Sequence, residues 1–300
     1  MTDPFPCSDL VVHSRYAYAL AAAQEGDWRG AADVLEQTLE RAPTWPPALF
    51  ALGEALAKLG DVERAAEAFR ASLSADPTDT QGAAARLALL GAAPAFLSPA
   101  YVARLFDDYA PRFEQHLTSA LAYRGPALVA EAIESVAPGA RYAAALDLGC
   151  GTGLAGVALR ARVDRLLGVD LSAAMIEKAR ARRIYDALEV GEAVAHLERH
   201  VAAFDLIVAA DTLVYLGDLA DVFVATARAL TPNGLFVFTV ETSADEGYRL
   251  NATMRFSHAP AYVEAMAAAA GLRPITMKAA WARREGGIEA PGLVCVCARD

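Results

Sequence analysis

The alternation of apolar and polar positions divides the chain into two regions with different periods. Residues 11–91 carry apolar side chains at helical spacing, whereas from residue 142 onward short apolar runs end in Gly or Asp and alternate with helical patterns. Such runs predict strands, and the segments between them predict crossover helices. We therefore expect an all-α N-terminal domain and an α/β domain with a doubly wound, mostly parallel sheet.

The apolar runs define the predicted strands. They cover residues 143–148, 165–169, 188–190, 206–209, 235–239, 274–278 and 292–297. The last two are joined by a loop that has no helical pattern, so we expect them to pair antiparallel. Cys295 and Cys297 alternate along the last strand, which predicts that both lie buried on the same face as small hydrophobic residues.

An internal repeat occupies the helical region. A helix, a Gly-Asp turn, a second helix and a proline recur after 34 residues, which is the spacing of tetratricopeptide repeats. The second copy resembles that family at Gly53 and Phe69, whereas the first has Ala19 and Leu35 in their places. The matching pairs are Gly26-Asp27 and Gly60-Asp61, Ala31 and Ala65, and Pro43 and Pro77.

The repeats also set the expected domain boundaries. A third helix over 80–90 would cap them, and the proline-interrupted segment 91–99 ends the pattern. We predict a repeat domain over 1–92, a linker with lid helices over 93–141, and the α/β domain over 142–300. The repeats predict either a groove for a protein partner or a surface for packing and self-association, and the sequence leaves both open.

Composition and charge disfavour several classes of binding partner. A net charge of −10 and a pI near 5.1 disfavour nucleic acid, which requires a concentrated basic surface. The sequence has no apolar run of the ~18–20 residues that a membrane span needs, and its start lacks a signal-peptide pattern, so we expect a cytoplasmic protein without a membrane partner. The four cysteines lack metal-ligand spacing, and no metal is expected.

Candidate chemistry centres on a glycine-rich turn. The first predicted strand contains Asp147 and runs into Gly149, Gly151 and Gly153, followed by a helical pattern. Asp170 ends the second strand, 21 residues after the first glycine, where one carboxylate can hold both hydroxyls of a ribose. A nicotinamide dinucleotide would fit this arrangement as well, but the glycine that such sites carry three residues after Gly151 is Leu154 here.

Four segments in order closely resemble the motifs of class I S-adenosylmethionine-dependent methyltransferases. They are Leu146-Asp-Leu-Gly-Cys-Gly-Thr-Gly153, Gly168-Val-Asp-Leu-Ser-Ala-Ala-Met-Ile-Glu-Lys-Ala179, Phe204 to Tyr215 and Leu230-Thr-Pro-Asn-Gly-Leu-Phe236. Segments 106–117 and 255–258 are similar to proteobacterial methyltransferases that carry N-terminal tetratricopeptide repeats. The resemblance implies a Rossmann-like domain, S-adenosylmethionine as cofactor, and methyl transfer to a small-molecule or protein-borne acceptor.

The resemblance also implies roles for single residues. The backbone N–H groups of Gly149, Cys150, Gly151 and Gly153 would face the methionyl end of the cofactor, and Asp147 its cationic groups. Asp170 would hold the ribose. The adenine would lie against Leu171 and Met175, with Glu192 and Ala193 accepting from its amine, and Asp211 would open onto the transfer site.

For the acceptor side, the resemblance places Tyr109, Phe113 and His116 over the site. Tyr109, His116 and His258 are the candidate catalytic residues, and His258 and Arg255 are expected to line the substrate pocket. His116 as a helix or core histidine is an equal alternative. Since the residues reveal no compelling general base, an acidic oxygen acceptor is slightly favoured over an alcohol. Two other functions stay open: a repeat scaffold without turnover, and a nicotinamide-dependent oxidoreductase.

Overall fold

The structure, a computed structural model, describes residues 5–119, 122–285 and 287–300. The chain divides into two compact units, Met1–Tyr101 and Val102–Asp300. The first contains a helical core and the second a sheet with hydrophobic cores on its faces. None of the described helices combines the length and the hydrophobicity needed to cross a bilayer.

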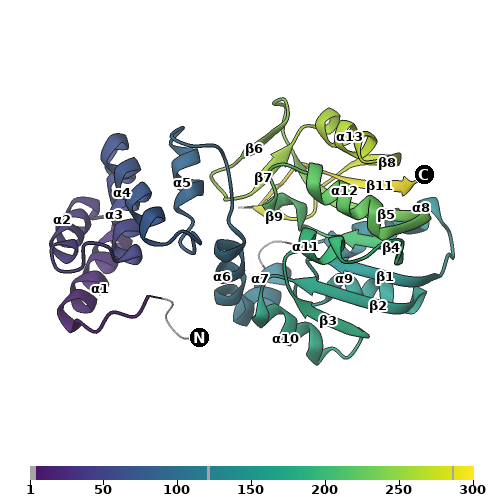
Figure 1. Cartoon of the computed structure of the whole chain (residues 1–300), viewed down its shortest axis with the longest axis horizontal. Coiled ribbons are helices and arrows are strands. Elements are labelled where there is room, and N and C mark those ends of the chain that lie inside the picture. Colours follow the sequence, from purple (N-terminus) through teal and green to yellow (C-terminus); the bar gives the residue numbers. More distant parts are fainter. Residues whose placement is uncertain (1–4, 120–121, 286) are drawn as a thin grey trace. The chain divides into compact units, whose positions relative to one another are not determined.

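The N-terminal unit is all-helical, as predicted (Figure 1). Consecutive helices pack against one another, and the predicted capping helix is present as α5. The helices are α1 (Leu10–Gln24), α2 (Trp28–Leu39), α3 (Pro46–Leu59), α4 (Val62–Ala75) and α5 (Ala83–Leu89).

The 34-residue repeat corresponds to one turn formed twice. Gly26 and Gly60 adopt left-handed φ values of 86° and 81°, which a side chain would strain. The aspartates that follow, Asp27 and Asp61, cap α2 and α4 by accepting a backbone N–H three residues on, at 2.9 and 3.3 Å. Each repeat is therefore a helical hairpin with the same turn chemistry.

The packing residues of the second repeat are also in place. A Cβ on Gly53 would lie 2.6 Å from the ring of Phe69, so only glycine allows the two helices this approach. In the first repeat the smaller pair, Ala19 and Leu35, is fully buried instead. The first copy matches the repeat pattern less well because it pairs alanine with leucine where the second copy pairs glycine with phenylalanine.

A nine-stranded sheet forms the centre of the second unit, and its main path runs β3-β2-β1-β4-β5-β11-β8. Strands β1 to β5 are parallel, while β11 runs antiparallel to β5 and β8, which confirms the predicted sheet. The strands are β1 (Tyr142–Leu148), β2 (Val163–Asp170), β3 (Ala187–Val190), β4 (Phe204–Ala209), β5 (Leu230–Thr242), β6 (Tyr248–Leu250), β7 (Phe256–His258), β8 (Leu272–Ala280) and β11 (Gly292–Arg299), with β9 (Arg284–Glu285) and β10 (Ile288–Glu289) pairing apart. Strands β6, β7, β9 and β10 have two or three residues each, too few for a recognisable alternation.

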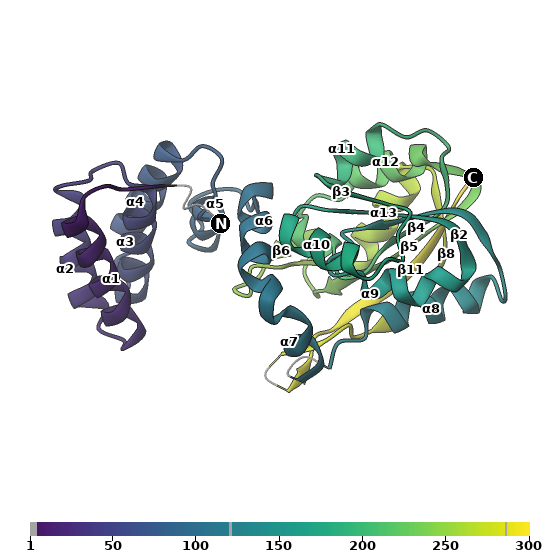
Figure 2. The same cartoon turned by 90° about the horizontal axis from the view of Figure 1, so that it is seen from below.

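Helices cover both faces of this sheet (Figure 2). Residues on β1 alternate between the two cores: Leu146 and Leu148 pack toward α11 to α13, and Ala145 packs toward α8 and α9. Cys295 and Cys297 share one buried face, as predicted. The helices are α6 (Pro99–Tyr109), α7 (Phe113–Ser119), α8 (Gly125–Val136), α9 (Leu154–Leu159), α10 (Ala173–Ala181), α11 (Ala193–Glu198), α12 (Ala220–Ala229) and α13 (Pro260–Ala269), with the 3-10 turns η1 (Ala110–Arg112), η2 (Arg160–Arg162) and η3 (Leu213–Tyr215).

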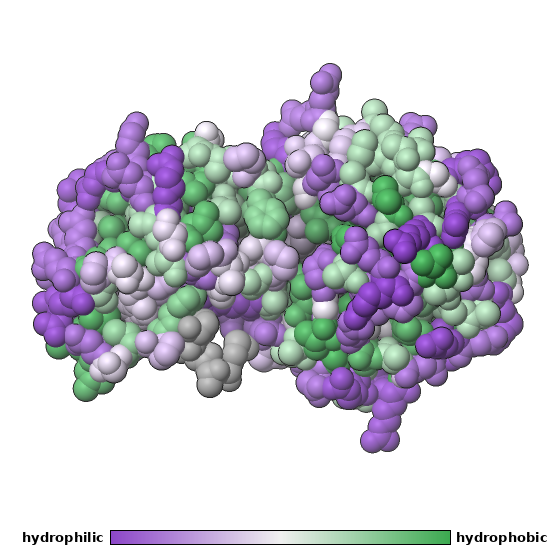
Figure 3. All heavy atoms as spheres, viewed as in Figure 1, coloured by the Kyte–Doolittle hydropathy of each residue, from purple (hydrophilic) through white to green (hydrophobic). Residues whose placement is uncertain are grey.

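Charged residues lie mainly at the surface of each unit. In the view of Figure 3, hydrophilic side chains are spread over both units with hydrophobic groups between them. Exposed ion pairs such as Arg41–Asp9 and Arg141–Asp164 each contribute little to stability. A charge cluster that is buried therefore stands out as a candidate for function.

The strand order reverses between β1 and β4. In a doubly wound sheet, ligands bind at this switch point, beyond the carboxyl ends of the strands. The glycine turn after β1 and the segment after β4 both lie there. The fold thus brings the motifs of residues 146–153 and 204–215 to one place.

Candidate functional site

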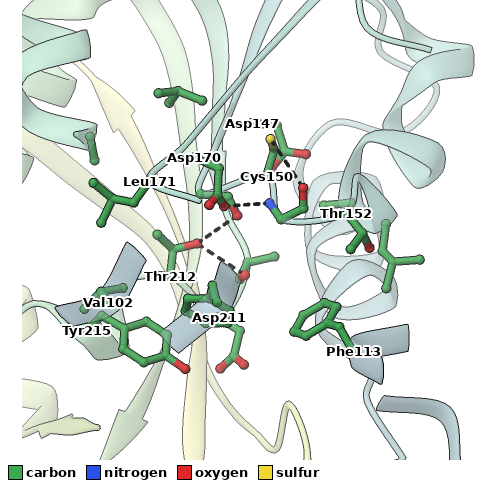
Figure 4. Close-up of a pocket in the computed structure, with 18 of the residues that line it drawn as sticks. Val102, Phe113, Asp147, Cys150, Thr152, Asp170, Leu171, Asp211, Thr212 and Tyr215 are labelled. Atoms are coloured by element: carbon green, nitrogen blue, oxygen red, sulfur yellow. Dashed lines mark hydrogen bonds between the residues drawn. The ribbon is translucent and has the colours of Figure 1, made fainter. Parts of the chain in front are cut away.

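A pocket lies at the switch point and has a volume of about 1200 Å³, its open mouth included. Figure 4 shows Asp147, Cys150 and Asp170 grouped around the glycine turn, with Asp211 and Tyr215 further along the pocket. Nine of the eleven predicted cofactor residues line it: Asp147, Gly149, Cys150, Gly151, Asp170, Leu171, Glu192, Ala193 and Asp211.

Each glycine of the turn has a different structural role. Gly149 is left-handed, with φ 70°, and a Cβ there would lie 2.3 Å from Thr212, so it permits a close approach between the β1 and β4 ends. A Cβ on Gly151 would meet nothing within 4 Å, which leaves open pocket space beside it. Gly153 begins α9 and lies against Tyr185.

The backbone N–H groups of the turn differ from expectation. Gly149 and Cys150 both donate to the Val169 carbonyl, at 2.8 and 3.0 Å, and Gly153 donates to the Cys150 carbonyl. The first two donors hold the turn against β2, the third closes the turn on itself, and none of the three is free for a ligand. The sequence could not reveal the first two hydrogen bonds because their acceptor lies on another strand.

Asp170 ends β2 and joins the turn to the pocket. Its Oδ2 accepts the Gly151 N–H at 2.8 Å, and its Oδ1 accepts the Ser172 N–H at 2.8 Å. Burial raises the pKa of Asp170, and these two backbone hydrogen bonds lower it. The carboxylate is therefore fixed in orientation, and each oxygen can accept one further hydrogen bond.

Asp147 is more deeply buried, with 1% of its surface exposed. Its Oδ2 accepts the Tyr185 hydroxyl at 2.6 Å, whereas its Oδ1 has no hydrogen-bond partner among the described residues. Burial raises its pKa to about 7, against the lowering effect of the Tyr185 hydrogen bond. A buried carboxylate oxygen beside a pocket, left without a donor, is a position for a cationic ligand.

The predicted adenine region is only partly at the pocket. Leu171 and Ala193 line it, but Met175, on α10, is fully buried and is not among the described lining residues, nor is Gly153 of the predicted methionyl end. Glu192 lines the pocket and also caps α11 by accepting the Ala195 N–H at 2.7 Å. Met175 thus supports the site from the core.

Aromatic and apolar side chains from α6 and α7 form the opposite wall. Phe106 packs edge-on against Tyr215, with ring centroids 5.2 Å apart, and Tyr109 packs likewise against Phe113. Burial raises the pKa of Tyr109, which keeps its hydroxyl protonated. His116 lies on α7, but its side chain is outside the described residues, so its role stays a prediction.

Two polar contacts fix α6 and α7 to α10. Asp107 accepts the Ser172 hydroxyl at 2.5 Å and the Ala174 N–H at 3.0 Å, at the start of α10. Glu114 accepts from Arg182 at 2.6 Å. The apolar wall is therefore held over the glycine turn by charges on both of its helices.

The other end of the pocket is built from charged groups. Arg255 is 8% exposed and donates to Asp211, to Glu241 at 2.7 Å and to the Tyr215 hydroxyl at 2.6 Å. Arg283 is 3% exposed and pairs with the same carboxylates, at 3.4 Å from Asp211 and 2.6 Å from Glu241. Four charges are thus buried as a network whose formal charge is zero.

The surroundings of Arg255 and Tyr215 shift the pKa of both groups upward. Burial opposes the charge of Arg255, but Asp211, Tyr215 and Glu241 outweigh it and raise the pKa of the guanidinium. Burial raises the pKa of Tyr215 to about 12. At neutral pH the arginine is charged and the tyrosine is a neutral hydroxyl.

His258 is placed differently from the other predicted residues. It is completely buried at the end of β7 and is not among the described lining residues. Its Nε2 lies 3.0 Å from the carbonyls of Leu216 and Gly217, so this nitrogen donates and fixes the loop after η3. A direct catalytic role for His258 finds no support in this placement.

Sequence reasoning missed several residues of the pocket. They are Thr212 and Arg283, which line it, and Tyr185, which contacts Asp147. Thr212 follows Asp211 directly and could have been considered, whereas Arg283 lies in an irregular segment without a motif. Among the described residues, no group of three or more His, Cys, Asp or Glu side chains could hold a metal ion.

Comparison with known proteins adds family information. Residues 146–236 match the family model described as methyltransferase domain, and residues 16–80 match that described as tetratricopeptide repeat. The chain is 38% identical over 87 residues to human methyltransferase-like protein 27, covering 28% of this chain and 35% of the relative. It is 30% identical over 140 residues to malonyl-[acyl-carrier protein] O-methyltransferase of Salmonella typhimurium, covering 46% and 52%.

These alignments span a third to a half of the length of the curated relatives. Among solved structures, a Burkholderia thailandensis 1,6-didemethyltoxoflavin-N1-methyltransferase with bound S-adenosylhomocysteine superposes with a TM-score of 0.53 at 17% identity. This match covers 68% of this chain and 91% of the other. At that identity it supports the fold of the α/β unit.

Proposed function

We infer that this chain, which joins tetratricopeptide repeats to a methyltransferase domain of the S-adenosylmethionine-dependent class, transfers a methyl group from that cofactor to an acceptor bound beside Asp211 and Tyr215. The observation that carries this proposal is a single pocket with two carboxylates at one end and a buried charge network at the other. The acceptor is a small molecule or a group carried on a protein.

The residues present fit the cofactor. Asp170 can receive ribose hydroxyls on oxygens already oriented by backbone N–H groups. Asp147 offers an unpartnered buried oxygen to the cationic methionyl end. The open space beside Gly151 lies in the pocket that both carboxylates line and would be filled by the ligand.

S-adenosylmethionine supplies a methyl group activated on a sulfonium. The work of the chain is to bring the acceptor into line and to exclude water, and the apolar wall of α6 and α7 suits both tasks. Tyr109 lies on this wall as a protonated hydroxyl that can orient an acceptor. It is a donor in this role and does not need to take up a proton.

An oxygen acceptor, and a carboxylate in particular, is the class that we favour. A carboxylate is ionised at neutral pH, so its methylation needs no general base. Arg255 stays charged at this end of the pocket, where Arg283 also lies, and arginine is the side chain best suited to carboxylates. The Salmonella relative is by name an O-methyltransferase that acts on a malonyl group on a carrier protein.

The test uses the full chain and methyl-labelled cofactor. Carboxylic acids and their matching amides are offered, together with fractionated cell extract, and the labelled products are treated with mild alkali. A carboxyl acceptor gives methyl esters, which release the label as methanol, whereas N-methyl products and ethers keep it. Alkali-stable label would contradict the carboxyl acceptor while leaving methyl transfer intact.

Binding measurements separate the alternative functions. Calorimetry with S-adenosylmethionine should show binding to the wild-type protein. Cofactor binding without transfer to any fraction would favour a scaffold. Quenching or enhancement of the fluorescence of a reduced nicotinamide dinucleotide would instead favour an oxidoreductase.

We further propose that the repeats bind a protein partner or a second copy of the chain. The support is the match to tetratricopeptide repeats and the complete hairpins of both copies. Light scattering of the purified protein tests self-association. A monomer at every concentration would leave the partner proposal and contradict the second copy.

A further inference from the structure

Tyr185 lies between α10 and β3, in a slot walled by glycines from three elements. A Cβ on Gly156 would lie 2.2 Å from the Tyr185 hydroxyl oxygen, and Cβ atoms on Gly153 and Gly168 would each lie 3.0 Å from its ring. Any side chain at these positions would push the ring away. The last glycine of the turn therefore makes room for a tyrosine and not for a ligand.

The ring carries a hydroxyl to the buried end of Asp147. The Tyr185 hydroxyl donates to Asp147 Oδ2 at 2.6 Å, while Oδ1 stays without a partner among the described residues. Burial raises the pKa of the Tyr185 hydroxyl far above its ordinary value, so it is always the donor. The Tyr185 hydroxyl thus holds Oδ2 of Asp147, and Oδ1 is left to accept a hydrogen bond from a ligand.

Among the described residues, no arginine, lysine or histidine shifts the pKa of Asp147. The groups that do so are the Tyr185 hydroxyl, Asp170 at the end of β2 and the Gly156 backbone N–H, and none of these carries a positive charge. Without a cation a carboxylate buried to this depth takes up a proton, and a cationic ligand would compensate its charged form instead.

We propose that Tyr185 is a positioning residue that holds one oxygen of Asp147 so that the other meets the cationic methionyl end of the cofactor. The proposal rests on the proposed function, since it needs S-adenosylmethionine in the pocket. It extends the binding site beyond the motifs, to a residue 38 positions after Asp147. It also predicts which part of the cofactor depends on the tyrosine.

The experiment compares two ligands on two variants. Tyr185→Phe keeps the ring in the slot and removes the hydroxyl. Tyr142→Phe is the matched control, because Tyr142 is 6% exposed and its hydroxyl has no partner among the described residues and lies outside the pocket lining. The ligands are S-adenosylmethionine and 5′-methylthioadenosine, which keeps the nucleoside and the sulfur but lacks the amino-acid part.

We expect Tyr185→Phe to weaken S-adenosylmethionine binding about tenfold in calorimetry, as expected for one lost hydrogen bond to a charged group, and to leave 5′-methylthioadenosine binding unchanged. Tyr142→Phe should change neither. Equal losses for both ligands, or no loss for either, would overturn the positioning role, because a residue that only shapes the loop cannot distinguish them. If Tyr185→Phe fails to fold, Asp147→Asn should give the same selective loss.

The failure of this proposal can be told apart from that of the proposed function. Wild-type protein that does not bind S-adenosylmethionine would overturn the function and this inference together. Wild-type binding that Tyr185→Phe and Asp147→Asn leave intact would overturn the inference alone.

Discussion

At the end of the pocket formed by β1 and β2, Asp147 and Asp170 accept hydrogen bonds from neutral groups: a tyrosine hydroxyl and backbone N–H groups. At the other end, the carboxylates of Asp211 and Glu241 are paired with two arginines. Neither Asp147 nor Asp170 forms an ion pair with a described residue, whereas the four charges at the second end sum to zero. The comparison suggests that a missing countercharge marks where a cationic ligand binds, and that a complete network serves the fold as well as the acceptor.

The largest effect is expected when the complete network is broken. Arg255→Met leaves two buried carboxylates with one arginine, so the free energy of unfolding should fall by about 3–5 kcal/mol in urea. Arg141→Met is the control, because Arg141 and Asp164 form a pair with more than half of each side chain exposed. Its loss should cost at most about 1 kcal/mol. Similar small losses for both would show that the buried network adds no stability.

The next effect is the pH dependence of the free energy of unfolding that Asp147 should cause. Burial raises the pKa of Asp147 to about 7, against about 4 in the unfolded chain. Between these values the folded protein binds more protons, so the free energy of unfolding should fall as the pH rises from about 4 to 7. Asp147→Asn removes this titration and should be more stable than the wild type at pH 8, by roughly 2–4 kcal/mol.

Urea unfolding at a series of pH values measures this difference. Asp170 also has a pKa raised by burial and contributes to the slope in both proteins, so the comparison is between variants. Asp164→Asn, on the exposed part of β2, should keep the wild-type slope. An unchanged slope in Asp147→Asn would mean that this carboxylate stays ionised without a cation.

A third prediction tests whether Asp170, at the same end of the pocket as Asp147, contributes to cofactor binding. Asp170→Asn keeps the shape but turns one acceptor into a donor that faces a backbone N–H, either of Gly151 or of Ser172. We expect the affinity for S-adenosylmethionine to fall about 30- to 100-fold, or about 2–3 kcal/mol. Calorimetry measures it, with Asp164→Asn again as control. Wild-type affinity in Asp170→Asn would remove this carboxylate from the binding site.

The sequence predicted the fold well because the fold follows from local periods. Strands such as β1 and β4 are short apolar runs followed within two residues by a glycine or an aspartate, and the repeat hairpins are defined by Gly-Asp turns. The short strand β7 was missed because three residues cannot display an alternation. The same locality explains why Asp147 and Asp170 could be placed at the strand ends that line the pocket, while their roles toward a cofactor stay predictions.

What could not be predicted depends on contacts between distant segments. The Gly149 and Cys150 N–H groups are taken up by Val169 on the next strand, and the sequence does not show this pairing. Arg283 meets Asp211 from 72 residues away, at the far end of the chain. Such contacts depend on how the sheet edges and loops meet, which no period in the sequence encodes.

The smallest effect on stability is expected for glycine-to-alanine substitutions, which also test whether the space beside Gly151 holds a ligand. Gly151→Ala adds a methyl group that meets no protein atom within 4 Å, at a φ of 53°, so unfolding should be easier by only about 1 kcal/mol. Gly26→Ala, with φ 86° and equally open surroundings in the repeat unit, should cost the same. Only Gly151→Ala should weaken S-adenosylmethionine binding, about tenfold or more in calorimetry, because its methyl group enters the pocket next to Asp170. Equal cofactor affinity in both variants would mean that the space beside Gly151 is not where the cofactor lies.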